Sequence, residues 1–488
     1  MSSKELCMTL VQASSEDKVS KIIESNDLLK NEKNWTPFSN NENNTGTFLN
    51  QQSHPVAALT EKIVNSIDAL LIAECRLRNI DPESAKAPRS MHEAVEEFFG
   101  IANGNFSEVD DKRRREIAKN IQVIAEGSKR LPTIIVVDRG EGQNPKEFEN
   151  TFLAMGAKNK IKIQFVQGKF HMGGTGALPF CGTKHYQLIL SRRHPKLLSG
   201  SQKDLWGFTL LRYRVPTGYV RSGCFEYCTD ERGYILQFEG EPLPILPNGE
   251  ILEHGSFIKM YDYRLDRPSI IHRDLWRELN RHLFSPALPI LLFENRDFEK
   301  NVSDKPLLGN KMRLRVDDNK LVEDTISIDA KLGDFGLCRV EVTILKADAF
   351  KSDNAVREEF TTQNHAIFFT INGQTHSTIG RSFLKAERKA NLDYLADYMI
   401  VHVDVTHIPT DIRDHAFMGS RDRMRDDEVK RRVEEDLAQE LRKHEGLRLL
   451  NQHRRERAIV SSPKDEEFLK KLLGKLIKTN SSIVEILR

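Results

Sequence analysis

The sequence has no long hydrophobic run. A membrane-spanning helix needs about 18 or more consecutive apolar residues, whereas the longest apolar stretches here, such as 134–137 and 288–293, have the length of buried strands. The first ten residues, MSSKELCMTL, lack the basic start and apolar core of a secretory signal. We therefore expect a cytoplasmic protein with no membrane association.

Cysteine is scarce, and neither sign of charge is in excess. The six cysteines in 488 residues form no CxxC pair, so disulfide scaffolds and structural zinc sites are not expected. The 73 Lys and Arg residues against 71 Asp and Glu residues give a formal net charge of +2. This balance excludes a histone-like mode of nucleic-acid binding, although a local basic patch remains compatible with it.

The common nucleotide-binding signatures are missing as well. The chain has no GxxxxGK[ST] P-loop, no GxGxxG after a predicted strand and no HExxH. Four other segments, spread between residues 61 and 258, carry the candidate chemistry instead.

The first segment is EKIVNSIDA, residues 61–69, inside an apolar pattern that predicts a helix beginning near Ala57. Glu61, Asn65 and Asp68 share one helical face because they are spaced i, i+4 and i+7. A carboxylate one turn from a carboxamide suits a water-activating base beside a metal ligand. A solvated helix face with a satisfied amide explains the same spacing.

The second segment, DRGEG, follows the run TIIVV, which predicts a buried strand. Asp138 at the strand end can accept a hydrogen bond from an exocyclic amine. Gly140 and Gly142 allow the backbone to approach a ligand closely. A simple glycine-rich turn is the alternative interpretation.

The third and fourth segments are weaker signals when taken singly. Residues 168–176 contain four glycines ahead of a predicted helix, where backbone amides could hold phosphates. Residues 254–258, HGSFI, enter a predicted strand.

Together and in this order, the four segments resemble the GHKL superfamily of ATP-binding proteins, which includes gyrase-type topoisomerases, large heat-shock chaperones, histidine kinases, and the MutL and MORC ATPases. Residues 61–69 match its ExxxN[AS]xDA motif, 138–142 its DxGxG motif, 168–176 its glycine-rich lid, and 255–258 its GTx[IV] strand entry with Ser for Thr. Ser66 and residues 157–160 are closest to the MutL, MORC and chaperone spellings. The resemblance covers residues 50–265 and implies the Bergerat nucleotide-binding fold.

The resemblance implies ATP and Mg²⁺ as cofactors and a role for each matched residue. Glu61 would be the general base that activates the attacking water, and Asn65 would coordinate Mg²⁺ that bridges the phosphates. Asp138 would bind the adenine amino group, with a water shared by Ser256, and Asp68 would support the site. The other implied contacts are Gly140 and Gly142 beside the base and ribose, the lid residues Gly168, Gly173, Gly174, Thr175 and Gly176, and the phosphate partners Lys158, Lys160 and Lys169.

The lid departs from the superfamily's GxxGxG pattern at His171, which stands where a glycine that approaches phosphate is expected. Either the loop shifts onto residues 173–176 or the phosphate end of the site differs. Further along, Gln374-Thr375-His376 resembles the gyrase-type Gln-Thr-Lys loop that reaches the γ-phosphate, with His for Lys. A hairpin turn at Asn372-Gly373 is the interpretation that we favour there.

We expect an α/β protein in four parts. Residues 1–50 would form an N-terminal segment that either crosses to a second subunit as a dimer strap, or packs on its own domain or stays loose. A Bergerat-type α/β sandwich ATP-binding domain is expected over 51–300, and a smaller α+β transducer-like domain over 301–410. Charged helices are expected over 411–488, where 19 Lys and Arg and 16 Asp and Glu alternate.

Local patterns add further expectations. Helices are predicted over 17–29, 91–99, 112–125 and 275–284, strands within 184–263, 310–345 and 365–373, and a loop over 34–48.

These features predict a Mg²⁺-dependent ATP-binding protein and slow ATPase. Lid closure and dimerisation as a homodimer would control a protein partner or effector. Two alternatives stay open. One is an ATP-sensing switch that does not hydrolyse the nucleotide, and the other is a MORC-like or MutL-like clamp that holds nucleic acid with the basic helices after residue 411.

Overall fold

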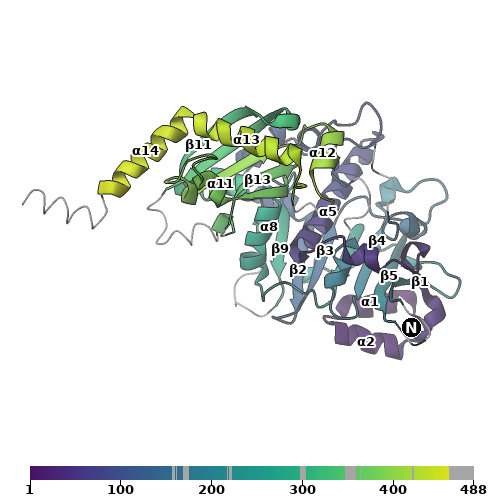
Figure 1. Cartoon of the computed structure of the whole chain (residues 1–488). Coiled ribbons are helices and arrows are strands. Elements are labelled where there is room, and N and C mark those ends of the chain that lie inside the picture. Colours follow the sequence, from purple (N-terminus) through teal and green to yellow (C-terminus); the bar gives the residue numbers. More distant parts are fainter. Residues whose placement is uncertain are drawn as a thin grey trace, which may run out of the picture. The chain divides into compact units, whose positions relative to one another are not determined.

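The computed structural model describes residues 1–155, 160, 162–168, 175–216, 218, 222–296, 304–346, 359–362, 364–419 and 423–460. The described residues form a mixed α/β fold with two mixed sheets (Figure 1). They divide into two compact units. The first contains Met1–Asn319, Ile371–His376 and Met418–Arg423, and the second contains the described residues of Lys320–Thr370, Ser377–Phe417 and Met424–Arg488.

The sheet of the first unit has ten strands within the described ranges, in the order β1-β6-β5-β4-β8-β3-β2-β9-β10, with β7 paired to β5. Neighbouring strands are antiparallel except β2 and β9, which are parallel. The strands are β1 (Trp35–Pro37), β2 (Ile121–Gly127), β3 (Pro132–Asp138), β4 (Gln187–Arg192), β5 (Leu205–Arg214), β6 (Cys224–Cys228), β7 (Leu236–Glu239), β8 (Gly255–Met260), β9 (Ile290–Glu294) and β10 (Asp304–Leu307).

The helices of this unit are α1 (Ser3–Gln12), α2 (Glu16–Ser25), α3 (Asp27–Lys30), α4 (Thr45–Leu49), α5 (Pro55–Leu77), α6 (Met91–Phe99), α7 (Asp111–Ala118), α8 (Trp276–His282) and α9 (Asn310–Met312). The predicted helix over residues 61–69 is confirmed as part of α5. His54 caps this helix, because its Nδ1 accepts a hydrogen bond from the Val56 amide, and Pro55 occupies the first helical position.

Strand β3 divides the core into two layers. Ile134 and Val136 belong to the hydrophobic cluster that includes α5, whereas Ile135 and Val137 belong to the cluster that includes α1. Successive side chains of a strand point to opposite faces of the sheet. The next residue of the first set is Asp138, so its carboxyl lies on the face covered by α5.

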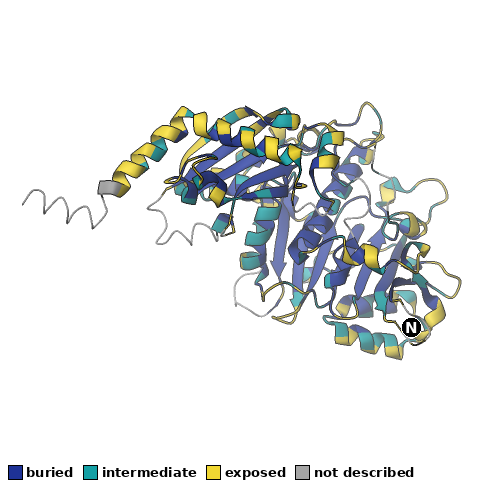
Figure 2. Cartoon of the chain, viewed as in Figure 1, coloured by how far each residue is buried: buried dark blue, intermediate teal, exposed yellow. Residues whose placement is uncertain are grey.

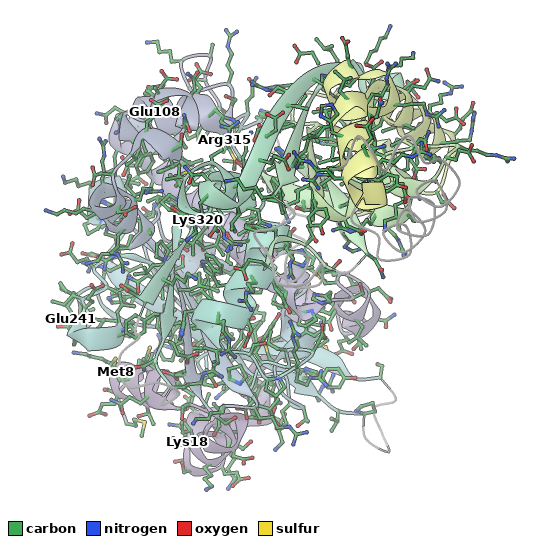
Figure 3. The ribbon with its side chains drawn as sticks, turned by 90° about the vertical axis from the view of Figure 1, so that its left-hand side faces the viewer. Met8, Lys18, Glu108, Glu241, Arg315 and Lys320 are labelled. Atoms are coloured by element: carbon green, nitrogen blue, oxygen red, sulfur yellow. The ribbon has the colours of Figure 1, made fainter. Side chains whose placement is uncertain are left out.

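The N-terminal segment packs on the sheet of its own unit. Leu6 and Leu10 of α1 are buried, and Lys259 of β8 donates to the Val11 carbonyl at the end of that helix. Figure 3 shows Met8 of α1 beside the segment that carries Glu241. Within this single chain, residues of the N-terminal segment thus contact the sheet of their own unit.

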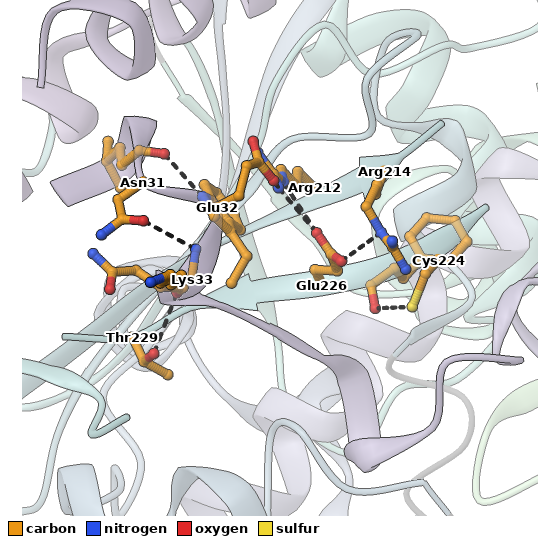
Figure 4. Close-up of polar contacts among 12 residues, drawn as sticks. Asn31, Glu32, Lys33, Arg212, Arg214, Cys224, Glu226 and Thr229 are labelled. Atoms are coloured by element: carbon orange, nitrogen blue, oxygen red, sulfur yellow. Dashed lines mark hydrogen bonds and ion pairs between the residues drawn. The ribbon is translucent and has the colours of Figure 1, made fainter. Parts of the chain in front are cut away.

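A charged network ties the same segment to the strands β5 and β6 (Figure 4). The Arg212 guanidinium lies 3.9 Å from the centre of the Trp35 ring and pairs with both Glu32 and Glu226. Arg214 pairs with the other oxygen of Glu226 at 2.7 Å. Because Glu226 is buried, its paired arginines offset the cost of removing the carboxylate from water.

The second sheet has the order β11-β12-β15-β13-β14, in which β13 and β15 are parallel. It belongs to the second unit except for residues 371–376, at the turn between β13 and β14, which belong to the first. The strands of this sheet and the helices of the second unit are β11 (Val322–Lys331), β12 (Leu337–Leu345), β13 (His365–Ile371), β14 (Gln374–Gly380), β15 (Met399–Asp404), α11 (Arg381–Lys385), α12 (Thr410–Ala416), α13 (Glu428–Lys443) and α14 (Glu445–Val460). Val433, Leu437 and Leu441 form the buried stripe of α13, while most of α13 and α14 is exposed (Figure 2).

Three local predictions need correction. The helix expected over 112–125 ends at Ala118, and Ile121–Gly127 is strand β2. Its residues 121–125 are buried on both faces, a short apolar pattern that fits a helix and a strand equally well. The loop expected over 34–48 contains β1 and most of α4. Its polar Asn44 can be buried because the side-chain amide donates to the Phe225 carbonyl and accepts from the Phe225 amide. Residues 310–317, expected as strand, are helical.

Among the described residues, no helix combines the length and the apolar character that crossing a bilayer requires.

The burial of α1 generates a stability prediction. Leu10→Ala should lower the free energy of unfolding by about 2–5 kcal/mol, because it leaves a cavity between α1 and the sheet. Leu49→Ala, at a position where the side chain is exposed, should change it by less than about 0.5 kcal/mol. Urea unfolding of both variants measures the difference. Equal effects would show that α1 does not contribute to the core.

Candidate functional site

A cleft in the first unit lies between α5 and the sheet. It contains about 960 Å³ of empty space, part of it open to solvent. The cleft brings together residues from all four sequence segments. The lining side chains that carry polar groups are Lys62, Asn65, Ser66, Asp138, Glu141, Gln143, Thr151, Lys160, Thr175, Gln187 and Ser256.

Asp138 is the buried carboxyl group of the cleft. Its Oδ1 accepts a hydrogen bond from the Gly140 amide at 3.0 Å, and its Oδ2 accepts one from the Ser66 hydroxyl at 3.3 Å. Burial raises the pKa of Asp138 to about 7, although the Gly140 and Ser66 hydrogen bonds oppose the shift. Each carboxylate oxygen has a second lone pair, so the group keeps accepting capacity for a ligand.

Two serines extend this polar region across the sheet. Ser256 of β8 is the register partner of Asp138, and Ser191 of β4 is the partner of Ser256. The two serine Oγ atoms lie 3.3 Å apart, and the Ser191 hydroxyl donates to the Gly255 carbonyl at 2.7 Å. Three adjacent strands thus place an aspartate and two hydroxyls in a row.

The glycines of the DRGEG segment make close contacts within the protein itself. A Cβ at Gly140 would lie 2.8 Å from the carbonyl carbon and Cβ of Ala69 in α5. Gly142 has a φ of +60°, and a Cβ there would lie 1.8 Å from the Arg192 carbonyl oxygen. Both glycines are needed for the strand end to pack against α5 and β4, which is a reason for them independent of any ligand.

Asp68 anchors the beginning of the predicted lid. Its buried carboxylate accepts hydrogen bonds from the amides of Gln167 at 2.9 Å and Gly168 at 2.8 Å, and from the Lys160 ammonium at 3.3 Å. Asn65 lines the cleft one turn earlier, and a Cβ at Gly168 would lie 3.0 Å from its Oδ1. The supporting role expected for Asp68 therefore has a physical basis in these contacts.

Glu61 is also buried, with 3% of its surface exposed. Its Oε1 accepts a hydrogen bond from the side-chain Nε2 of Gln374 at 2.7 Å. The side-chain Oε1 of Gln374 accepts a hydrogen bond from Nε2 of Gln167. The Gln167 Nε2 also lies 3.1 Å from Nε2 of His376. Residues 371–376 belong to the first unit, so a glutamine 313 positions away in the sequence orients the proposed base.

The predicted hairpin turn is confirmed. Asn372 and Gly373 join β13 to β14 with φ values of +48° and +76°. Positive φ at both central residues is the type I′ geometry that favours Asn-Gly.

The remaining lid residues are only partly described. Thr175 lines the cleft, and its hydroxyl donates to the Gln51 side chain at 2.5 Å. Gly176 packs closely on Gln52, which a Cβ would approach to 2.8 Å. Lys158, Lys169, His171, Gly173 and Gly174 lie outside the described residues.

Sequence reasoning missed Lys62, Gln167 and Ser191. Lys62 stands inside the EKIVNSIDA motif, where a charged residue predicts an exposed position, yet it is buried and lines the cleft. Ser191 ends a predicted strand, and period-two alternation from Ile189 is the one signal that places it on the α5 face.

Within the described ranges, no group of three or more His, Cys, Asp or Glu side chains is arranged to hold a metal ion. A cation in this cleft would therefore depend on ligand oxygens as well as on Asn65.

No protein-family model matches this chain, and no curated protein matches it either. The geometry of the cleft and the motif spacing therefore carry the functional argument.

The raised pKa of Asp138 predicts a pH dependence of stability. The folded state keeps the Asp138 proton up to about pH 7, whereas the unfolded chain loses it from about pH 4 upward. The contribution of the protonated carboxyl to the free energy of unfolding is therefore complete below about pH 4 and is lost as the pH rises to about 7. Asp138→Asn cannot ionise and should be more stable than the wild type at pH 8, with a smaller advantage at pH 5.

Urea unfolding at both pH values, with the exposed substitution Asp17→Asn as control, measures this effect. An Asp138→Asn advantage that is the same at pH 5 and pH 8 would contradict the assigned titration.

Proposed function

We propose that this chain is a Mg²⁺-dependent ATP-binding protein and slow ATPase of the GHKL type, acting in the cytoplasm through a Bergerat-type nucleotide site. The observation that carries the proposal is the arrangement of the cleft. A buried aspartate and a serine face it from the sheet, while α5 contributes Asn65 and Ser66 to its wall and holds the buried Glu61 one turn earlier. The motifs that resemble the superfamily thus converge on one site.

Asp138 would bind the exocyclic amine of adenine. Its carboxyl is fixed by Ser66 and Gly140, so the acceptor is oriented before a ligand enters. The neighbouring Ser256 hydroxyl can share a water with the base. Apolar side chains of Ile189, Leu211 and Ile258 line the same cleft and suit a flat aromatic ring.

Glu61 would accept a proton from the attacking water. The side-chain amide of Gln374 donates to one carboxylate oxygen of Glu61 at 2.7 Å and so fixes the orientation in which the carboxylate would meet the water. Gln374 is in this sense a positioning residue, because it acts through Glu61.

Asn65 would hold the cation. Its carbonyl oxygen is a hard ligand of the kind that Mg²⁺ accepts alongside substrate phosphates and waters. When bound, Mg²⁺ would neutralise phosphate charge. Lys160, which is paired with Asp68 at 3.3 Å, lies at the same side of the cleft and would supply further positive charge.

The adenine assignment predicts a binding defect. Asp138→Asn should weaken ATP affinity by roughly 5- to 150-fold, because it replaces an acceptor with a donor facing the base amine, at a cost of about 1–3 kcal/mol. Isothermal titration calorimetry with the wild type and with Asp17→Asn as control measures the change. ATP affinity equal to wild type would rule out Asp138 as the base-binding residue.

The roles of Glu61 and Asn65 predict two different defects. Glu61→Ala should keep ATP binding and lose hydrolysis by at least about 100-fold, since a general base acts only in the chemical step. Asn65→Ala should lose hydrolysis too, and its ATP affinity should no longer depend on Mg²⁺. Phosphate release and calorimetry with and without Mg²⁺ distinguish the two. Unchanged turnover in Glu61→Ala would remove it from the mechanism.

A non-hydrolysing switch is the second candidate function, and the Glu61–Gln374 contact favours it. The side-chain amide of Gln374 occupies an acceptor position of Glu61 that an attacking water would otherwise use. Wild-type protein that binds ATP and releases no phosphate would select this function. In either case we propose a homodimer that controls a protein partner.

A further inference from the structure

Lys62 differs from the other buried charged groups of the cleft. It lies on α5, it is 7% exposed, and its side chain lines the cleft. Among the described residues it has no hydrogen-bond acceptor and no ion-pair partner. By contrast, the fully buried Lys259 pairs with Glu126 and donates to the Val11 carbonyl.

The carboxylates that line or flank the cleft are engaged elsewhere. Asp68 pairs with Lys160, Glu141 pairs with Arg193 at 3.1 Å, and Asp138 is held by Ser66 and Gly140. Burial lowers the pKa of Lys62 to about 8, and the Cys181 thiol is the one group that opposes this shift. A buried ammonium without a partner lowers the free energy of unfolding, because the contact with water that it loses on folding is not replaced within the protein.

A structural lysine would extend its ammonium to water or pair it. Lys62 has no such partner among the described residues, and the space open to its side chain is the cleft. We propose that Lys62 is a ligand-binding residue, whose ammonium donates a hydrogen bond to an acceptor atom of the nucleotide. This inference rests on the proposed nucleotide site and adds a residue that the superfamily motif leaves variable.

Two parts of a nucleotide carry acceptors that an ammonium can meet. One is the nucleoside, through a ring nitrogen of the base or a ribose oxygen, and the other is a phosphate oxygen. Both use the same charge-assisted donor, which is worth about 1.5–3 kcal/mol. A series of ligands that differ only in phosphate number separates the two.

The test compares wild type with Lys62→Met, which keeps the length of the side chain and removes the charge. Calorimetry at pH 7 with adenosine, ADP and ATP should show a 10- to 150-fold loss of ATP affinity in the variant. A loss already present with adenosine places the contact at the nucleoside, and a loss that appears only with ADP and ATP places it at a phosphate. Lys18→Met, on the surface of α2, is the control.

The pH dependence gives a second readout. Three other titratable groups line the cleft with Lys62, namely Asp138, Glu141 and Lys160. The Cys181 thiol interacts with Lys62 as well. Only the protonated Lys62 carries the charge, so wild-type affinity should fall as pH rises from 7 to 9. Lys62→Met should lose this part of the dependence, while Asp138→Asn should keep it.

Thermal unfolding without ligand separates a binding role from a structural one. Lys62→Met should raise the melting temperature at pH 7, because an unpaired buried charge is removed. A lower melting temperature, or ATP affinity equal to wild type, would overturn the inference. If the wild-type protein binds no adenine nucleotide, the proposed function itself fails. If the wild type binds ATP and Lys62→Met binds it equally well, only the inference about Lys62 fails.

Discussion

The packing of α5 against the sheet is the constraint on which the site depends. Every candidate side chain of the EKIVNSIDA segment is placed by this helix, and the end of β3 reaches it so closely that Gly140 has no room for a Cβ next to Ala69. The Glu141 amide donates to the Ala69 carbonyl at the same point. Helix and strand end are thereby locked together, and Asp138 is held beside Ser66 as a consequence.

Burial of charge is the second theme of the site. Asp68, Glu141 and Glu61 are nearly inaccessible to water, and each has polar partners that satisfy it. Asp138 is satisfied by two donors but still has a strongly raised pKa. Lys62 is the exception among the described groups that line the cleft. A buried charge without a partner lowers the stability of the fold. Such charges are characteristic of functional sites, where a ligand can provide the missing partner.

Some of this arrangement could be predicted from periodicity. The i, i+4, i+7 spacing of Glu61, Asn65 and Asp68 predicted a shared helical face, and the TIIVV run predicted the strand that ends at Asp138. The helical prediction over 112–125 failed in its second half because residues 121–125, which include the polar Gln122, are buried on both faces. Neither a helix nor a strand period is visible in such a segment, and pairing with β3 and β9 decided its structure.

The sequence by itself determined the local elements and the spacing of polar groups along them, because these depend on neighbours within a few residues. Only the tertiary structure decided which of those groups meet. The Glu61–Gln374 hydrogen bond joins residues 313 positions apart, and the row of Asp138, Ser256 and Ser191 depends on a register across three strands. The same is true of Lys62, whose charge predicts exposure. The packing of α5 on the sheet buries that lysine in the cleft instead, because contacts between distant segments override the preference of a single residue for water.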